Sequence, residues 1–348
     1  MKVSLKDIAK ELGISTAAVS KALNDLPGVS DALRVKVKQT AQRMGYTKYI
    51  KASIVNAYER KMKFIAVLYG PVGGNLVGEI QAGIDDQIRR RGYYELRYMI
   101  DTFHDMDTER QKELFLSKIS EERGMVGVLS CYVKLSDVLI SKLYKQNLPV
   151  VLLESETEFG RCVTIDNVRA SYKAASKLVE LGRRKIGCVM PPEDSDRIWH
   201  DRFTGYRRAL RDAGIQYDPS LIVYENWIAV KPGGLATKML LEQNPGVDAV
   251  LYGSDKLAYG GLKMLRDLGK KVPQDVAVIG FDDEELSIAV QPSLSSVRQP
   301  IRKMAETGLT LLLDSIEKGD LSPRNVQLDT ELMLRGSCVK DYKEDVWR

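Results

Sequence analysis

The chain has 348 residues, of which 44% are hydrophobic and 28% are charged, and its net charge is +5. That length allows two or three compact units, and no stretch reaches the roughly 20 apolar residues of a membrane span. Four dispersed cysteines, two histidines and the lack of a secretory leader predict no metal site, no cofactor and a cytoplasmic location.

The charge is divided unevenly along the chain. Residues 1–63 hold 13 lysines and arginines against 5 acidic residues, a net charge of +8, whereas the remaining residues sum to −3. A basic end on a near-neutral body predicts a polyanionic partner for that end alone, as for a nucleic-acid-binding segment.

The basic end opens with the pattern of two short helices. Ser4, with Asp7 three residues later, marks a helix start. Gly13 then supplies a turn, and Ser15 can cap a second helix. Apolar residues at helical spacing give each helix a buried face: Leu5, Ile8, Ala9 and Leu12 in the first, and Ala18, Val19, Ala22 and Leu23 in the second. The pattern predicts a helix-turn-helix that enters the DNA major groove; the alternative is an ordinary helical hairpin.

A third helix after Ser30 completes a DNA-reading headpiece over residues 1–46, and the basic residues 47–63 are predicted to form a hinge or linker. Beyond it, strands and helices alternate in two similar sets, which predicts two doubly wound α/β lobes. The expected strands are 64–70, 95–101, 124–131, 148–154, 185–191, 220–226, 247–253 and 276–283. The expected helices are 77–91, 108–122, 136–146, 167–181, 201–213, 233–243 and 255–268. Ligands of such sheets bind beyond the carboxyl ends of the strands, so facing lobes predict a cleft.

In this order, the segments resemble the lactose-repressor (LacI/GalR) family of bacterial transcription regulators over nearly the whole length. The most specific match is LKDIAKELGIS followed by AVSKALN and VSDALRVKVKQTAQRMGY in the headpiece. Downstream matches are VTIDNVRAS, KLVELGRRKIG, RFTGYRRAL, YGSDKLAYGGL, VAVIGFDD and PSLSSVRQPIRKMAETG.

The resemblance implies a homodimer or higher oligomer whose affinity for double-stranded operator DNA is controlled by a small, sugar-like effector. It implies lobes of the periplasmic-binding-protein type within residues 64–348. The first lobe is expected to hold about 64–164 with 298–322, and the second about 165–295 with 325–340.

Base reading is expected from the exposed side of the second helix, at Thr16, Ala17 and Lys21. Lys21 can donate to guanine N7 and O6, and the other two carry methyl groups that suit thymine. Phosphate contacts are expected from Ser15, Ser20 and Asn24. Ala52 matches the hinge alanine of the family and Val55 stands at its leucine position, so the resemblance assigns both to DNA as well.

Effector contacts are expected from the strand ends that face the cleft. Arg202 stands in RFTG, where family members often present an arginine to the effector, and it is expected to start a helix. Asp282 ends an apolar strand and can accept from a sugar diol, or it caps the next loop. Asp255 is either a ligand residue or a helix cap. The other expected contacts are Asn75, Trp227, which could stack on a sugar, Ser254 and Gln299.

The leading interpretation is therefore an effector-responsive, sequence-specific regulator, most simply a repressor, and not an enzyme. One alternative is an enzyme, such as a sugar kinase or dehydrogenase, fused to a DNA-binding headpiece; no Walker loop, dinucleotide fingerprint or nucleophile elbow occurs in the sequence. Another is a plain solute-binding protein, which the basic headpiece disfavours.

Overall fold

The computed structural model describes residues 3–23, 26–46, 62–70, 74–100, 108–122, 124–158, 160–340 and 342. The headpiece contains α1 (Leu5–Leu12), α2 (Thr16–Leu23) and α3 (Asp31–Arg43). These helices bury their apolar faces against one another around Ile8, Val19 and Val37, which confirms the predicted helix-turn-helix and third helix. The predicted positions Asn24, Ala52 and Val55 lie outside the described residues, as do residues 47–61 of the expected linker.

The headpiece helices begin where the capping residues predict. The Asp7 carboxylate accepts from the Ser4 backbone N–H at 2.8 Å and from its hydroxyl at 2.7 Å. Ser15 Oγ accepts from the N–H of Ala18 at 3.1 Å at the start of α2. Such caps satisfy backbone donors that have no partner within the helix, so they fix the helix starts locally.

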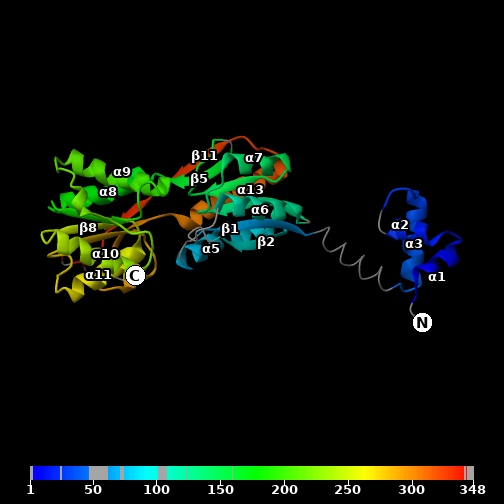
Figure 1. Cartoon of the computed structure of the whole chain (residues 1–348), viewed down its shortest axis with the longest axis horizontal. Coiled ribbons are helices and arrows are strands. Elements are labelled where there is room, and N and C mark those ends of the chain that lie inside the picture. Colours follow the sequence, from blue (N-terminus) through cyan, green and yellow to red (C-terminus); the bar gives the residue numbers. More distant parts are fainter. Residues whose placement is uncertain are drawn as a thin grey trace.

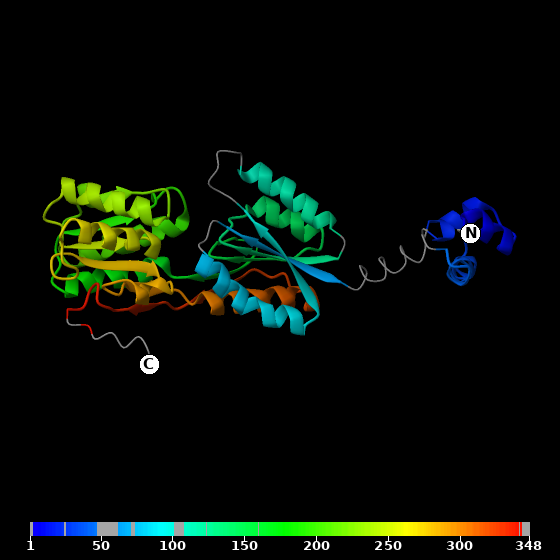
Figure 2. The ribbon, with the colours of Figure 1, turned by 90° about the horizontal axis from the view of Figure 1, so that it is seen from below.

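In the first lobe, the described residues form a six-stranded parallel sheet with the order β11-β5-β4-β3-β1-β2. Its strands are β1 (Lys63–Tyr69), β2 (Tyr93–Met99), β3 (Met125–Cys131), β4 (Val150–Leu153), β5 (Arg161–Ile165) and β11 (Arg324–Leu328). Its helices are α5 (Gly74–Arg90), α6 (Thr108–Glu121), α7 (Asp137–Lys145) and α13 (Ile301–Lys318). Helices α5 and α13 lie side by side on one face, and α6 and α7 cover the other (Figure 2).

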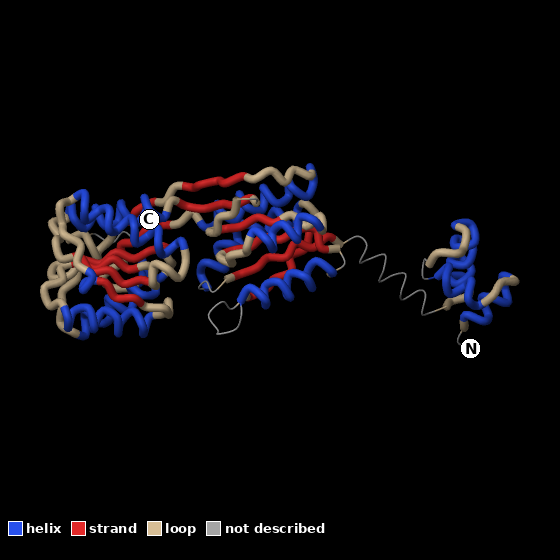
Figure 3. The backbone as a smooth tube through the Cα atoms, turned by 45° about the horizontal axis from the view of Figure 1, so that its top comes forward, coloured by secondary structure: helices blue, strands red, loops and turns tan. Residues whose placement is uncertain are grey.

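The second lobe repeats this plan, with the order β12-β10-β9-β8-β6-β7, and β12 runs antiparallel to β10. Its strands are β6 (Ile186–Met190), β7 (Ile222–Tyr224), β8 (Ala249–Tyr252), β9 (Ala277–Asp282), β10 (Ser295–Arg298) and β12 (Glu331–Met333). Its helices are α8 (Asn167–Glu180), α9 (Arg197–Asp212), α10 (Val230–Gln243), α11 (Asp255–Asp267), α12 (Leu286–Ala289) and the short 3-10 helix η1 (Pro219–Leu221). Helices cover both faces of each sheet (Figure 3), which confirms two doubly wound α/β lobes.

The core lies between the sheets and their helices because successive residues of a central parallel strand pack against helices on opposite faces of the sheet. Along β1, Ile65, Val67 and Tyr69 face α5 and α13, whereas Ala66 and Leu68 face the other layer. All five are fully buried. Burial of each large apolar side chain contributes about 1.5–3 kcal/mol, so the strands themselves anchor each lobe.

The chain passes between the lobes three times within the described residues: from β5 to α8, from β10 to α13 and from β11 to β12 (Figure 1).

Two details of the predicted lobe boundaries are wrong. Residues 325–328, expected in the second lobe, belong to β11 and pair with β5 in the first sheet. Arg298, expected in the first lobe, ends β10 of the second sheet. β11 pairs with a strand that lies far earlier in the chain, so local sequence does not reveal its sheet.

Candidate DNA-reading surface and ligand cleft

The second helix of the headpiece presents the expected residues to its surroundings. Thr16, Ala17 and Lys21 are exposed on α2, and the opposite side of the helix is buried against the other headpiece helices. Ser15 is also exposed, although its hydroxyl caps the helix, and Ser20 is half-buried. The three base-reading candidates therefore share one accessible side of one helix.

A cavity of about 610 Å³ lies between the two lobes. Both sheets point the carboxyl ends of their strands toward it: Tyr132 follows β3, Ser254 follows β8, and Asp282 ends β9. The cavity is lined by Leu76, Lys112, Tyr132, Lys134, Pro191, Ser195, Asp196, Ile198, Trp199, Arg202, Asn226, Trp227, Ile228, Ser254, Lys256, Asp282, Glu284 and Gln299. Strand ends near the point where the strand order reverses are where doubly wound sheets bind ligands.

Arg202 lines this cavity and is only 3% exposed. It lies in the second turn of α9, not at the helix start, because Asp196 caps the helix and α9 begins at Arg197, four residues before the predicted start at residue 201. Its Nε donates to Asn167 Oδ1 at 2.9 Å and its Nη1 donates to the Gly253 carbonyl at 2.7 Å. The ring of Phe281 packs under the guanidinium, 3.5 Å from its central carbon.

The remaining donors of Arg202 are available to a ligand. Its Nη2 has no hydrogen-bond partner among the described residues, and this nitrogen is not fully buried. The side chain lines the cavity, so a ligand bound there can reach the donors that have no partner in the protein. Burial lowers the pKa of Arg202, and nearby carboxylates oppose that shift, so the group stays charged.

Asp282 stands on the cleft wall of the second lobe with its neighbour Gln299. Gln299 Nε2 donates to Asp282 Oδ1 at 2.7 Å, and the Tyr132 hydroxyl donates to Gln299 Oε1 at 3.3 Å. Loss of water around the carboxylate raises the pKa of Asp282 to about 7, against the opposing charge of Arg202. Near neutral pH the group is therefore present both as a carboxylate, which accepts from hydroxyl groups, and as a carboxylic acid, which can also donate.

Asp255 does not reach the cavity, so its expected contact with a ligand is wrong. The side chain is completely buried. Its carboxylate accepts from the Glu284 N–H at 2.9 Å, the Ser287 hydroxyl at 2.7 Å and the Ser296 hydroxyl at 2.6 Å. It ties α11 to the loop after β9 and to β10, whereas Ser254 before it caps α11 and lines the cavity.

Trp227 lines the cavity with 58% of its surface exposed, on the loop between β7 and α10. The side chain of Asn75 lies outside what the structure describes, so that expected contact stays a prediction. Of the seven expected effector residues, the structure brings five to one cavity: Arg202, Trp227, Ser254, Asp282 and Gln299.

Sequence reasoning missed several residues of the cleft. Trp199 stacks near the Arg202 guanidinium at 5.0 Å, one turn of α9 before it. Its position three residues before an expected ligand arginine was a usable signal, because such residues share a helix face. Lys112 and Lys134 enter from the first lobe, where only tertiary structure places them.

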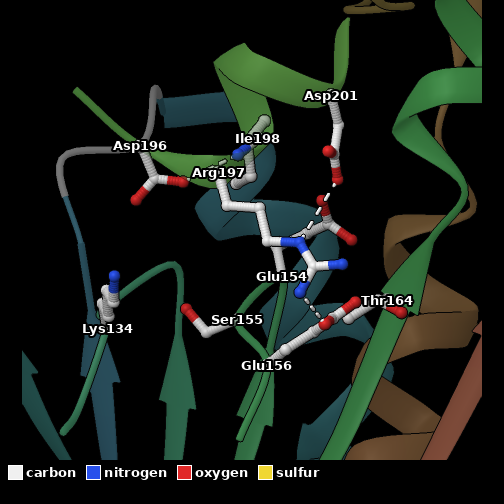
Figure 4. Close-up of a pocket in the computed structure, with 9 residues that line it drawn as sticks. All are labelled: Lys134, Glu154, Ser155, Glu156, Thr164, Asp196, Arg197, Ile198 and Asp201. Carbon is white, nitrogen blue, oxygen red and sulfur yellow. Dashed lines mark hydrogen bonds and ion pairs between the residues drawn. The ribbon is translucent and has the colours of Figure 1, made fainter. Parts of the chain in front are cut away.

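A smaller pocket of about 190 Å³ adjoins the cleft and shares Lys134, Asp196 and Ile198 with it. In this pocket Arg197 of the second lobe pairs with Glu156 of the first, and its Nε lies 3.5 Å from Asp201 (Figure 4). Glu154 stands behind this pair, between the two lobes. The pocket therefore lies where the lobes meet.

Within the described residues, no cluster of His, Cys, Asp and Glu is arranged to hold a metal ion. No helix in the described part of the chain has the length and apolar character needed to span a membrane.

Family models match both parts of the chain. Residues 4–48 match the bacterial regulatory proteins of the lacI family, and residues 175–338 match a periplasmic binding protein-like domain. The chain is 30% identical over 341 residues to the HTH-type transcriptional regulator RegA of Clostridium saccharobutylicum, covering 97% of this chain and 100% of that one. It is 31% identical over 339 residues to the HTH-type transcriptional repressor CytR of Escherichia coli K12, covering 96% of each.

Solved structures agree with these relatives. A complex of the transcriptional regulator CelR with cellobiose matches with a TM-score of 0.70 and 27% identity, over 97% of this chain and 100% of that one. A LacI-family regulator from Enterococcus faecium with bound ribose matches with a TM-score of 0.70 and 25% identity, over 80% and 100%. Sharing a headpiece, two lobes and sequence along nearly its whole length with these proteins, the chain belongs to the lacI family of bacterial transcriptional regulators.

Proposed function

We propose that this protein binds operator DNA through α2 and that a small polyhydroxylated ligand, a sugar or sugar derivative, sets its operator affinity by binding in the cleft. The observation that carries the ligand part is Arg202: a nearly buried, charged guanidinium that lines the cavity and whose Nη2 has no partner among the described residues. Asp282 on the same wall supplies an acceptor, and Trp227 an exposed apolar ring. This combination of donor, acceptor and aromatic face suits a sugar.

Relatives support the same class of ligand, since CelR is solved with cellobiose and the Enterococcus faecium regulator with ribose. The family consists of DNA-binding regulators, so the enzyme alternative has no support. A protein that acts on the chromosome works in the cytoplasm, and twofold symmetry of a homodimer would present two headpieces to a pseudopalindromic operator.

The test combines DNA selection with ligand titration. Genomic fragments selected by the full-length protein should contain a pseudopalindrome, and a thermal-shift panel that includes cellobiose and D-ribose should reveal a ligand. Arg202→Ala should weaken that ligand about tenfold or more, because a charge-assisted contact contributes about 1.5–3 kcal/mol. It should leave operator binding intact without ligand. Loss of operator binding alone would contradict the assigned roles of the two parts.

A further inference from the structure

Asn167 occupies a position between the ligand arginine and the first lobe. It is the first residue of α8, directly after the crossover from β5, and it is 6% exposed. Its Oδ1 accepts from Arg202 Nε at 2.9 Å, and its Nδ2 donates to Glu154 Oε2 at 3.0 Å. An amide has an acceptor at one end and donors at the other, so these two partners fix its orientation.

Glu154 holds the same crossover from the first lobe. It follows β4, is 4% exposed, and adopts a left-handed φ of 56°, which is uncommon for a residue with a side chain. Its Oε1 accepts from the backbone N–H of Ile165 at 2.8 Å, where β5 ends and the chain leaves the lobe. Both carboxylate oxygens therefore bond to the crossover, one to its backbone and one to Asn167.

Close packing of α8 and α9 brings Arg202 to this point. Gly205 lies one turn after Arg202, and a Cβ on it would stand 2.2 Å from the Val168 carbonyl oxygen. Phe281 packs against one face of the guanidinium, which leaves rotation in its plane as the main freedom. Asn167 and the Gly253 carbonyl remove that freedom and leave Nη2 without a partner among the described residues.

We infer that Asn167 and Glu154 are positioning residues for the ligand site. Glu154 orients the amide of Asn167, and Asn167 orients the Arg202 guanidinium, so the ligand-binding edge of the second lobe is set by a carboxylate of the first lobe. This inference rests on the proposed function only in taking Arg202 as a ligand residue.

The arrangement also couples the ligand to the relative position of the lobes. Glu154 and Asn167 lie on opposite sides of the β5–α8 crossover, so a change in lobe arrangement alters the bond between them. A ligand held by correctly oriented Arg202 favours the arrangement in which that bond persists, as the linkage of binding and conformation requires. Tyr132, Gln299 and Asp282 form a parallel link at the second crossover.

The hydrogen bond between Asn167 and Glu154 can be broken and restored by exchanging its donor and acceptor. Glu154→Gln alone sets an amide donor against either Asn167 Nδ2 or the Ile165 N–H. Asn167→Asp alone sets a carboxylate against Glu154. The double variant, Glu154→Gln with Asn167→Asp, restores a matched pair. The amide introduced at position 154 accepts from the Ile165 N–H and donates to the carboxylate introduced at position 167, which accepts from Arg202. Each single variant leaves a buried group without a suitable partner, and the double variant does not.

The direct measurement is the side-chain Nε–H resonance of Arg202 in ¹⁵N-arginine-labelled protein, assigned by its loss in Arg202→Lys. In each single variant we expect the resonance to shift and its exchange with water to become about tenfold faster or more, and in the double variant to return toward wild type. Glu156→Gln is the matched control, because Glu156 is on the same loop as Glu154 but is exposed and pairs with Arg197. This variant should leave the Arg202 resonance unchanged.

A parallel titration measures the effect on ligand binding, with cellobiose and D-ribose as the probes. The single variants should bind the active probe about tenfold more weakly, and the double variant within about threefold of wild type. The positioning role is overturned if the Arg202 resonance is unchanged in both single variants. It is also overturned if the double variant is no closer to wild type than the worse single variant. Where Asn167→Asp alone does not fold, the comparison of the double variant with Glu154→Gln decides. A wild type that binds neither sugar instead contradicts the sugar class proposed above, and the resonance still decides the positioning.

Discussion

At the scale of single residues, neighbouring aspartates at the end of β9 have different roles. Asp282 lines the ligand cavity, whereas the buried Asp283 pairs with Arg335 at 2.6 Å and Arg298 at 2.7 Å. Both have a positive φ, 114° and 57°, which costs about 1–3 kcal/mol per residue. The two ion pairs of Asp283 hold this strained turn in place, and Asp282 in the same turn lines the cavity.

The raised pKa of Asp282 predicts a pH dependence of stability. An aspartate with a pKa of 3.8 in the unfolded chain and about 7 in the folded protein binds its proton more tightly when folded. Its contribution to stability is therefore complete below about pH 4 and is lost as the pH rises toward 7. The melting temperature of wild type relative to Asp282→Asn should fall over this range, measured without ligand. Parallel curves for the two proteins would show that Asp282 has an ordinary pKa.

At the scale of elements, the close contact between α8 and α9 requires a residue without a side chain at position 205, where the chain has glycine. At Gly205 a Cβ would meet the Val168 carbonyl at 2.2 Å and the Tyr172 backbone nitrogen at 2.8 Å. Since these are backbone atoms, the helices must separate to admit a methyl group. The separation would also carry Arg202 away from Asn167, so a packing position controls the geometry of the ligand site.

We therefore expect Gly205→Ala to lower the melting temperature and to weaken ligand binding, at a cost of about 1–3 kcal/mol in stability for overpacking. The matched control is Gly78→Ala in α5, an exposed position where a Cβ meets no atom within 4 Å. Alanine should stabilise a helix there by up to about 1 kcal/mol. Calorimetric melting of both variants checks the contrast, which fails if the two substitutions shift the melting temperature in the same direction.

At the scale of the whole molecule, the positive charge is concentrated in the DNA-binding part of the chain. The segment of net charge +8 contains the helix-turn-helix, and the near-neutral remainder contains the cleft. Operator affinity should therefore fall steeply with salt concentration, because bound lysines and arginines release counterions from the phosphates. Ligand affinity should change little over the same range. Equal salt dependence for the two would contradict separate sites.

Lys21→Ala tests sequence reading within this electrostatic background. We expect the specific operator to bind more weakly by about 1–3 kcal/mol and the preference at one base position per half-site to relax. Lys36→Ala on α3 removes the same charge from another exposed headpiece position and should retain the wild-type sequence preference. Selection of operator variants by the three proteins provides the comparison, and an unchanged preference in Lys21→Ala would remove that residue from base reading.

The headpiece, the alternation of strands and helices and five residues that line the cleft could be predicted from the sequence. Helix caps such as Ser4 and Ser15 and the periodicity of apolar residues act over a few positions. Strand ends such as Asp282 lie at the edge where doubly wound sheets bind ligands, and here Asp282 lines the cavity. Tertiary structure alone decided that β11 pairs with β5, that Asp255 is buried away from the cavity, and that Glu154 reaches Asn167. The reason is physical: strand partners and the burial of a polar side chain depend on contacts between residues distant in the chain, which no local pattern encodes.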